Sequence, residues 1–470
     1  MKKLLVFTSL FVAGCAVGPD YQRPDSVVSS SFKELEGWRS ATPQDEAPRG
    51  SWWSVFGDAE LDRLLARLDI SNQNVRAAEA RVRQAKSVAD QARAGYFPTV
   101  SANASAVRSK SPSLSNAPSF ATGAVNTFNA NVAASSWELD LWGKVRRTVE
   151  AGDASWQAST ADLEAAKLSA RAALAQSYFS LRVADVNRRL LEDTVAGYQR
   201  NLELTQNRYK AGVAARVDVV QAEQQLKGAQ AQLLDVGVSR AQFEHSIAIL
   251  IGEAPANFSL AATTDMPAMP RIPVSLPSLL LERRPDVAAA ERSTAAANAR
   301  IGVAKAAMFP SLSLSGTYGT RAADIADLFT VPSRLWSIGA AATQPLFDAG
   351  LRRAQTDQAI GQYDEAVATY RQTVLTAFQQ VEDNLAALRI LEEEAAVQAE
   401  TVEAARKSVE LTNNQYQAGV VSFLNVIITQ AALLNAEQNA ANVLGRRLNA
   451  SVGLVQALGG GWSTESLASR

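Results

Sequence analysis

The stretch Asn201-Leu-Glu-Leu-Thr-Gln-Asn-Arg-Tyr-Lys-Ala-Gly-Val213 occurs a second time in this chain, as Ser408-Val-Glu-Leu-Thr-Asn-Asn-Gln-Tyr-Gln-Ala-Gly-Val420. In each copy a helical pattern ends at a glycine, Gly212 or Gly419, and a second helical pattern begins directly after it. This arrangement is typical of a helical hairpin whose first helix is capped by the glycine. Because a repeat distance of about 200 residues is too long for a solenoid unit, we interpret the chain as a duplicated domain.

The segments around each copy predict very long helices. Proline is absent from Ser119 to Ala254 and again after Pro345. A helix from Lys144 to Ala211 would be roughly 100 Å long at about 1.5 Å per residue, so it requires a coiled-coil-like partner. Apolar and threonine residues recur in heptad register before both glycines, which predicts the same packing seam in both copies: Leu191, Val195, Tyr198, Leu202, Thr205 and Tyr209, then Val402, Ala405, Val409, Thr412 and Tyr416. A further helix is expected from Ala59 to Tyr96, and others run to about Leu250, Met308 and Leu458.

Four short segments have a different period. Polar and apolar residues alternate in each, which predicts strands with one polar and one apolar face: Thr99–Val107, Asn126–Ala134, Phe309–Gly316 and Trp336–Ala342. Strands of about ten residues can cross a bilayer at a tilt. Four strands cannot close a membrane barrel, and an open edge is not tolerated in lipid. If these strands span a membrane, several chains must pool them; three chains would supply twelve strands and a ring of twelve helical segments.

The composition removes several classes of function. The formal net charge is −1, which provides no electrostatic footprint for nucleic acid. The chain has one cysteine, Cys15, and one histidine, His245, so cysteine or histidine metal clusters are excluded. Glycines occur without the spacing of a phosphate-binding loop. We therefore expect no metal, no cofactor and no enzymatic activity.

The N-terminus has the pattern of an export signal. Residues 1–14 contain a charged start and a short apolar run, which is typical of a secretory signal peptide rather than a transmembrane helix. Val12-Ala-Gly-Cys15 resembles a bacterial lipobox, in which the cysteine becomes the lipidated N-terminus after cleavage. Ala16 follows in place of aspartate, which by the same resemblance favours export to the outer membrane.

These patterns divide the chain into six parts. A tether rich in proline, serine and tryptophan follows the signal, and a proline-rich connector separates the two repeats. The predicted bounds are 1–14 for the signal peptide, 15–57 for the lipidated tether, 58–253 for the first repeat, 254–284 for the connector, 285–462 for the second repeat and 463–470 for the tail.

Motifs spread over nearly the whole chain resemble those of the TolC-like outer-membrane efflux proteins, in particular the lipoprotein branch of the RND-linked channels. Besides the two Tyr-x-Ala-Gly-Val turns, they are Cys15-Ala-Val-Gly-Pro-Asp-Tyr21, Trp52-Trp-Ser-Val-Phe-Gly-Asp58, Phe97-Pro98, Leu279-Leu-Leu-Glu-Arg-Arg-Pro-Asp286, Phe309-Pro310 and Leu458-Gly-Gly-Gly-Trp462. The most specific is Arg283-Arg-Pro-Asp286 in combination with the lipobox.

The resemblance implies a mostly α-helical chain with a membrane β-barrel part, assembled as a homotrimer. A twelve-strand barrel in the outer membrane would continue into a twelve-helix barrel in the periplasm. The chain would serve as the exit duct of a tripartite efflux system, with a periplasmic adaptor, an RND-type inner-membrane pump and outer-membrane lipid as partners. The adaptor would meet the helical tips at Gly212, Val213, Gly419 and Val420.

The resemblance also suggests where the channel closes. Related chains often carry aspartates just after the second-copy turn, facing the pore axis. Here those positions are Asn425 and Ile428, while the first copy has Asp218 at the position matching Asn425. Tyr416, beside the tip, is a further gate candidate. We interpret Ile428, with Asn425 and Tyr416, as the basis of the resting closure; the alternatives are that Ile428 only packs on a neighbouring helix or that the Asp218 ring is the gate.

A lipid-anchored periplasmic coiled-coil scaffold without transport is the competing hypothesis. It accounts for the lipobox and the long helices. It does not account for four alternating segments of membrane-crossing length at matching places in the two repeats. An enzyme is the third class, and no residue pattern in the chain supports one.

Overall fold

The computed structural model describes residues 16–25, 31–34, 52–110, 124–267, 269–270 and 283–460. The signal peptide, Cys15, most of the tether, much of the connector and the tail therefore lie outside the described residues. The chain divides into two compact units. One unit holds the described residues of Met1–Asp25, Arg83–Ala158 and Ala290–Tyr370, and the other holds those of Ser26–Val82, Ser159–Ala289 and Arg371–Arg470.

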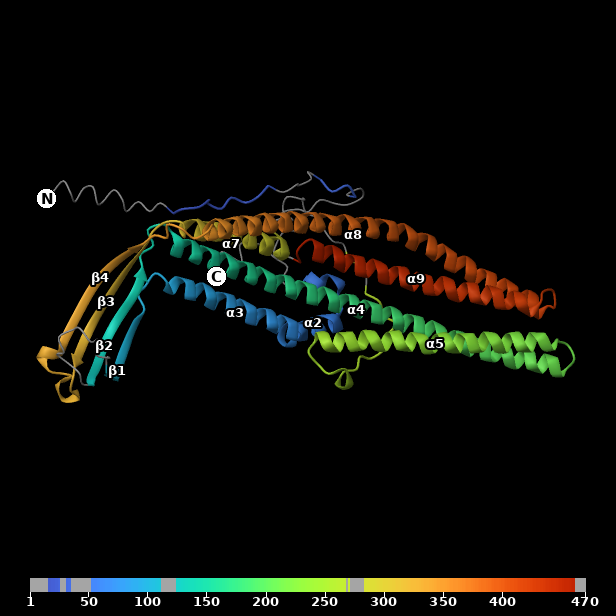
Figure 1. Cartoon of the computed structure of the whole chain (residues 1–470). Helices are drawn as coiled ribbons and strands as arrows, with labels where there is room; N and C mark the ends of the chain where they lie inside the picture. The colour runs from blue at the N-terminus through green and yellow to red at the C-terminus, as the bar shows by residue number, and fades with distance from the viewer. Residues whose placement is uncertain are drawn as a thin grey trace. The chain divides into compact units, whose positions relative to one another are not determined.

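The first unit contains the four predicted strands. They are β1 (Val100–Ser109), β2 (Val125–Glu138), β3 (Ser311–Ala322) and β4 (Arg334–Thr343). Figure 1 shows them side by side in one antiparallel sheet of order β1-β2-β3-β4. Each repeat supplies one hairpin, and two short 3-10 turns lie between β3 and β4, η3 (Ile325–Asp327) and η4 (Val331–Ser333). β1 and β4 are the two edges of this sheet.

The strand register separates an apolar face from a polar face. Val132 pairs with Tyr318, and Tyr318 pairs with Trp336, so these side chains lie on the same face as the alanines of β1. Asn131, which pairs with Asn103, belongs to the opposite face. The four strands therefore have the two-faced pattern that the sequence predicts, and no side chain on the apolar face is acidic.

All four strands are longer than expected, and β2 and β3 extend furthest beyond their predicted ends. β2 continues through an irregularity between Ala134 and Trp137, where Ser136 has φ of 56°, and an extra residue there interrupts the alternation. β3 continues through Gly316 and Gly319 to Ala322. At Gly319 a Cβ atom would collide with the Ala130 carbonyl of β2, so the glycine permits close strand approach instead of ending the strand.

Four helices form two hairpins with equal lengths in the two repeats. α4 (Lys144–Lys210) and α8 (Leu351–Gln417) each have 67 residues, and α5 (Arg216–Leu250) and α9 (Phe423–Ala457) each have 35. α7 (Pro285–Ala306) begins with proline, as expected from the fixed φ of that residue. Among the described helices, none is long and apolar enough to cross a membrane.

The predicted single helix from Ala59 to Tyr96 is wrong. The structure has α2 (Ala59–Ser71) and α3 (Gln73–Ala94), with a break at Asn72. The buried Asn72 amide donates to the Leu250 carbonyl at 2.7 Å, while its oxygen accepts from Val75 N–H at 3.0 Å. One side chain therefore begins α3 and fixes the end of α5, a long-range contact that no local pattern reveals.

The core of the second unit collects around α2. The 3-10 turn η1 (Trp52–Phe56) and α2 pack their apolar residues on Tyr178, Phe179 and Leu181 of α4, together with the ends of α5 and α9. Leu61, Leu64, Leu65 and Leu68 are fully buried there. Trp52 and Trp53 of the predicted tether are therefore core residues, and the short turn η2 (Pro255–Asn257) follows α5 at the edge of this core.

Residues 16–25 are bound to the first unit where the sheet meets the helices. Val17 N–H donates to the Trp142 carbonyl at 3.0 Å, and Asp20 pairs with the buried Arg147 at 2.7 Å. Gly18, at φ of 108°, lies so close to Gly302 of α7 that a side chain at Gly18 would clash with the α7 backbone. The described residue nearest to Cys15 is thus fixed beside the start of α4.

Candidate functional site

The two helical turns, residues 211–215 and 418–422, have the same backbone conformation. Gly212 and Gly419 both have φ of 75°. Val213 N–H donates to the Arg208 carbonyl at 2.9 Å, and Val420 N–H donates to the Gln415 carbonyl at the same distance. This is the hydrogen bonding of a glycine-capped helix end. Val213 and Val420 are 67% and 73% exposed, so both tips present an apolar side chain to solvent in this chain.

Asp218 caps the helix that follows the first turn. Its carboxylate accepts from Ala215 N–H at 3.1 Å at the start of α5. Asn425, at the matching place in α9, has no such contact through its side chain; its backbone N–H donates to the Ser422 carbonyl at 3.1 Å. Asp218 therefore stabilises the N-terminus of its own helix, α5, where a negative charge is favourable.

Asn425 and Ile428 lie on the exposed side of α9. Ile428 is 56% exposed, whereas Phe423 and Val426 are buried in a cluster with Tyr198 and Leu202 of α4. Positions three apart share a helix face. The two gate candidates therefore point away from the intramolecular cluster, and within one chain Ile428 is not a buried packing residue.

Tyr416 joins the two tips. Its ring lies 5.5 Å from that of Phe423, and the Arg208 guanidinium of the first copy is 4.7 Å from its centre. Sequence reasoning missed Arg208. The sequence does contain a signal for Arg208. The two repeats agree on both sides of this position but differ at it, since the second copy has Gln415.

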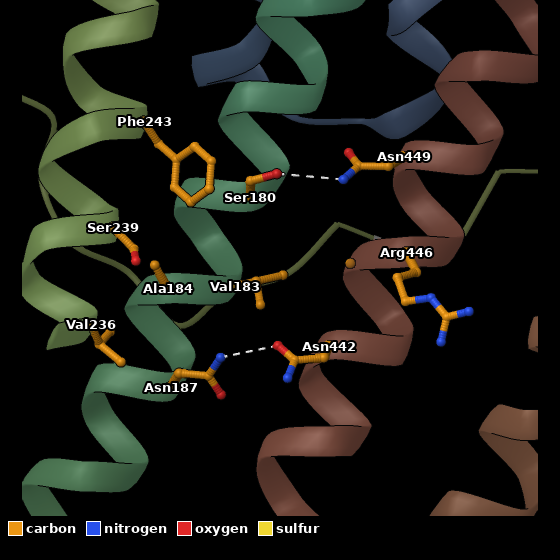
Figure 2. Close-up of a pocket in the computed structure, with 11 residues that line it drawn as sticks. Ser180, Val183, Ala184, Asn187, Val236, Ser239, Phe243, Asn442, Arg446 and Asn449 are labelled. Carbon is orange, nitrogen blue, oxygen red and sulfur yellow. Dashed lines mark hydrogen bonds between the residues drawn. The ribbon is translucent and has the colours of Figure 1, made fainter. Parts of the chain in front are cut away.

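Two polar side-chain pairs join α4 to α9 at a distance from the tips. Asn187 donates to Asn442 at 3.2 Å, and Asn449 donates to Ser180 at 3.4 Å, as Figure 2 shows. The two pairs are a heptad apart on both antiparallel helices. They border a hollow of about 390 Å³ that Val183, Val236 and Phe243 line with apolar groups. Polar pairs in a helical seam specify its register.

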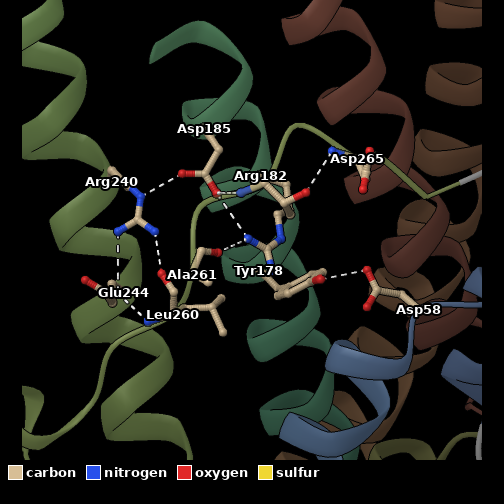
Figure 3. A network of polar contacts seen from close by, with 10 residues as sticks. Asp58, Tyr178, Arg182, Asp185, Arg240, Glu244, Leu260, Ala261 and Asp265 are labelled. Carbon is tan, nitrogen blue, oxygen red and sulfur yellow. Dashed lines mark hydrogen bonds and ion pairs between the residues drawn. The ribbon is translucent and has the colours of Figure 1, made fainter. Parts of the chain in front are cut away.

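A buried ionic network holds the segment after α5, as Figure 3 shows. Asp185 is 1% exposed and accepts from Arg240 at 2.6 Å and from Arg182 at 3.1 Å. The two guanidiniums donate onward to the carbonyls of Leu260 and Ala261 at 2.6 and 2.8 Å. A charge this deeply buried is stable only when paired and hydrogen-bonded, so the network ties the first described residues of the connector to the hairpin.

The neighbouring Tyr178 belongs to the same buried region. Its hydroxyl donates to Asp58 at 2.6 Å, and Asp58 also caps α2. Burial, with this hydrogen bond to Asp58, raises the pKa of Tyr178 above its usual range. Tyr178 therefore stays protonated and serves as a donor, not as an acid in chemistry.

The arginine motif before α7 has a structural role. Arg284 is 6% exposed; it pairs with Asp286 at 2.6 Å and donates to Gln380 and to the Ala457 carbonyl at 2.8 and 3.1 Å. It thereby joins the start of α7 to α8 and to the end of α9. Asp286 is in the first turn of α7, as predicted. Among the described residues, no group of histidine, cysteine, aspartate and glutamate could hold a metal ion.

Comparison with known proteins gives the same division of the chain into two repeats. The profile of the family described as "Outer membrane efflux protein" matches residues 64–253 and 276–460. The chain is 31% identical to the probable efflux pump outer membrane protein TtgC of Pseudomonas putida over 460 residues, which are 97% of this chain and 95% of that one. It is 33% identical to the pyoverdine export outer membrane protein OpmQ of Pseudomonas aeruginosa over 471 residues, covering 99% and 98%. The solved outer-membrane channel OprN superimposes with a TM-score of 0.88 at 30% identity, over 95% of this chain and 100% of that one.

Proposed function

The chain belongs to the outer membrane efflux protein family, and on that premise we propose that three copies of it form the exit duct of a tripartite efflux system. The protein is an outer-membrane efflux channel. Its family consists of channels and efflux proteins, and we assign it no catalytic step and no cofactor. We propose in addition the number of copies, the partners and the residues that act in transport.

The observation that carries the proposal is the open, two-faced sheet. β1 and β4 each leave one row of backbone groups without a partner strand in the sheet. Such edges are not tolerated in hydrocarbon. Pairing β4 of one copy with β1 of the next satisfies both edges, places the apolar faces against lipid and encloses the polar faces around a lumen. Three copies give twelve strands, which is enough for an aqueous pore.

The long helices support the periplasmic part of the proposal. Helices of 67 residues extend roughly 100 Å, far beyond the thickness of a bilayer. The two tips end in matching, exposed valines. We assign to these tips, at Gly212, Val213, Gly419 and Val420, the contact with a periplasmic adaptor, and through it with an RND-type inner-membrane pump. The named relatives serve an efflux pump and pyoverdine export, so the cargo proposed here is drugs or other small molecules.

Conductance in a planar bilayer tests the channel against the scaffold alternative. Purified protein should produce discrete current steps, because the polar strand faces enclose water. A coiled-coil scaffold anchored by lipid would bind the bilayer without passing current. Binding without any current steps, at concentrations that saturate the bilayer, would refute the proposal.

Cys15 should carry the lipid anchor of the mature chain. Ala16 and Val17 are held beside the start of α4, so acyl chains on the preceding residue would enter the membrane next to the sheet. Radioactive fatty acid should label the wild type and not Cys15→Ser. Labelling of the variant would contradict this assignment. Export activity of the variant should persist, because the pooled sheet itself holds the protein in the membrane.

Replacing Gly212 or Gly419 by valine tests the role of the tips. The left-handed conformation should cost a β-branched side chain about 1 kcal/mol or more, but a Cβ at either position meets no atom within 4 Å. We expect normal amounts of assembled protein and increased drug sensitivity of cells that depend on this channel. Gly197→Val is the matched control, since it lies in α4 away from the tip and its Cβ is also unobstructed. Unchanged resistance in both tip variants would remove the tips from the mechanism.

A further inference from the structure

The apolar face of the sheet ends in two arginines. Arg108 on β1 is opposite Asn126, and Arg334 on β4 is opposite Thr320. By the strand register, both pairs are on the same face of the sheet as Phe128, Tyr318 and Trp336, so both arginines belong to the apolar face. They occupy the end of the sheet away from the helices, one on each edge strand.

Both guanidiniums are available for a ligand. Arg108 and Arg334 are exposed, and neither has an ion pair or a side-chain hydrogen bond to another described residue. Within the strands the one acid is Glu138, which lies at the opposite end of the sheet and pairs with Lys144 at 2.9 Å. The connection between β3 and β4 contains two acids: the Asp324 carboxylate accepts from Ala326 N–H at 3.0 Å, and Asp327 lies in η3. The strands therefore present only positive charge on this face at this end.

The position of the two charges implies an anionic layer around them. A cationic side chain on a lipid-facing strand costs about 2–4 kcal/mol at the bilayer midplane and about 0–1 kcal/mol near the interface. Trp336, 74% exposed, is two residues from Arg334 on the same face and pairs with Tyr318, 63% exposed. Exposed tryptophan and tyrosine side chains are typical of the membrane interface, so the arginines lie at headgroup depth.

We propose that Arg108 and Arg334 bind the phosphates of a phosphorylated glycolipid of the lipid A class in the outer leaflet. The inference rests on the proposed function, in which the helices extend into the periplasm. The end of the sheet away from the helices, where the two arginines lie, would then be in the outer leaflet. Within one chain the two edge strands are three spacings apart, roughly 14 Å. Pairing of β4 with β1 of the next copy brings the two arginines to one junction, so the complete site requires a second copy. Guanidinium forks bind phosphate oxygens in pairs, which favours a phosphate-rich headgroup over a zwitterionic one.

Arg321 provides a matched control. It lies at the same end of the sheet, on β3, but in the register of the polar face, where it pairs with Asn129 and donates to its side-chain oxygen at 2.7 Å. Arg321→Gln removes the same charge from the opposite face at the same end of the sheet. It should leave the lipid contact intact.

The experiment compares wild type, Arg108→Gln, Arg334→Gln, the double variant and Arg321→Gln in phosphatidylcholine nanodiscs. The discs carry diphosphoryl lipid A, or phosphatidylglycerol at equal charge, and native mass spectrometry counts the lipid retained. Wild type and Arg321→Gln should retain lipid A; each single variant should lose affinity about tenfold, and the double variant more. Oligomer and conductance of the double variant should be unchanged.

Three results would overturn the inference. The first is full retention of lipid A by the double variant, and the second is an equal loss in Arg321→Gln. The third is equal retention of phosphatidylglycerol through the same arginines, which would make the site a general anionic-lipid contact. An inability of the wild type to form an oligomer or conduct would be visible separately and would refute the proposed function together with this site.

Discussion

Asp185→Ala should strongly destabilise the chain, lowering the free energy of unfolding by about 3–5 kcal/mol. Removing one member of a buried ionic group leaves its partners charged and without compensation. Arg182 is 4% exposed and Arg240 is 13% exposed, so water cannot replace the lost carboxylate. Thr263 N–H, which donates to Asp185 at 3.3 Å, would lose its acceptor as well.

Asp193→Ala is the control for that substitution. Asp193 pairs with Arg189 on the same helix, but both side chains are 62% exposed, and such surface pairs contribute about 0–1 kcal/mol. Thermal dissociation in detergent, followed by gel migration and circular dichroism, compares the two variants. If Asp185→Ala dissociates within a degree or two of Asp193→Ala, the network does not hold the connector in the way described.

Ile428→Ser should have the largest effect on transport. In an assembly of three copies, Ile428 would form a ring of three apolar side chains, and a narrow apolar ring can close a pore by expelling water. Replacing each isoleucine by serine removes apolar surface worth about 1 kcal/mol or more per copy. The resting conductance should therefore rise about tenfold or more.

Asp218→Asn distinguishes the apolar ring from an acidic one. Because the Asp218 carboxylate accepts from Ala215 N–H at the start of α5, asparagine, whose amide oxygen can accept the same hydrogen bond, should leave the resting conductance unchanged. Planar bilayers measure both variants. If Ile428→Ser stays closed while Asp218→Asn opens the channel, the ring of acids is the gate and the apolar ring is not.

The contact between Arg208 and Tyr416 would belong to the same proposed closure. It joins the first tip to the second within one chain, so movement of either hairpin must break it or carry the other hairpin along. Such a cation–π contact is worth about 0.5–2 kcal/mol. It restrains the tips without locking them, which suits a duct that opens when its partners bind.

The long elements of this fold could be predicted because their signals are local. The absence of proline, the heptads and the two capping glycines define α4, α5, α8 and α9 almost to the residue. Alternation gave the position and the two faces of all four strands. That the sheet has two open edges follows from the number of strands alone, because four strands cannot close a barrel.

What escaped prediction depends on contacts between distant residues. Asn72 ends a helix because it reaches the Leu250 carbonyl, and Gly319 continues a strand because β2 comes close to it. Asp185 accepts from Arg240, which lies 55 residues further along the chain, and Arg240 in turn donates to the Leu260 carbonyl of the connector. These residues look ordinary in the sequence, and only packing against distant residues gives them a role.

The central claim is that the open sheets of three chains close one another, and the mass of the protein extracted in mild detergent tests it most directly. One chain has a mass of 50.2 kDa. Light scattering corrected for detergent should give a single species of three chains, without a detectable folded monomer, because β1 and β4 have no partner in one chain. A stable monomer that keeps its full strand content by circular dichroism would contradict the account, since its sheet edges would then need no neighbour.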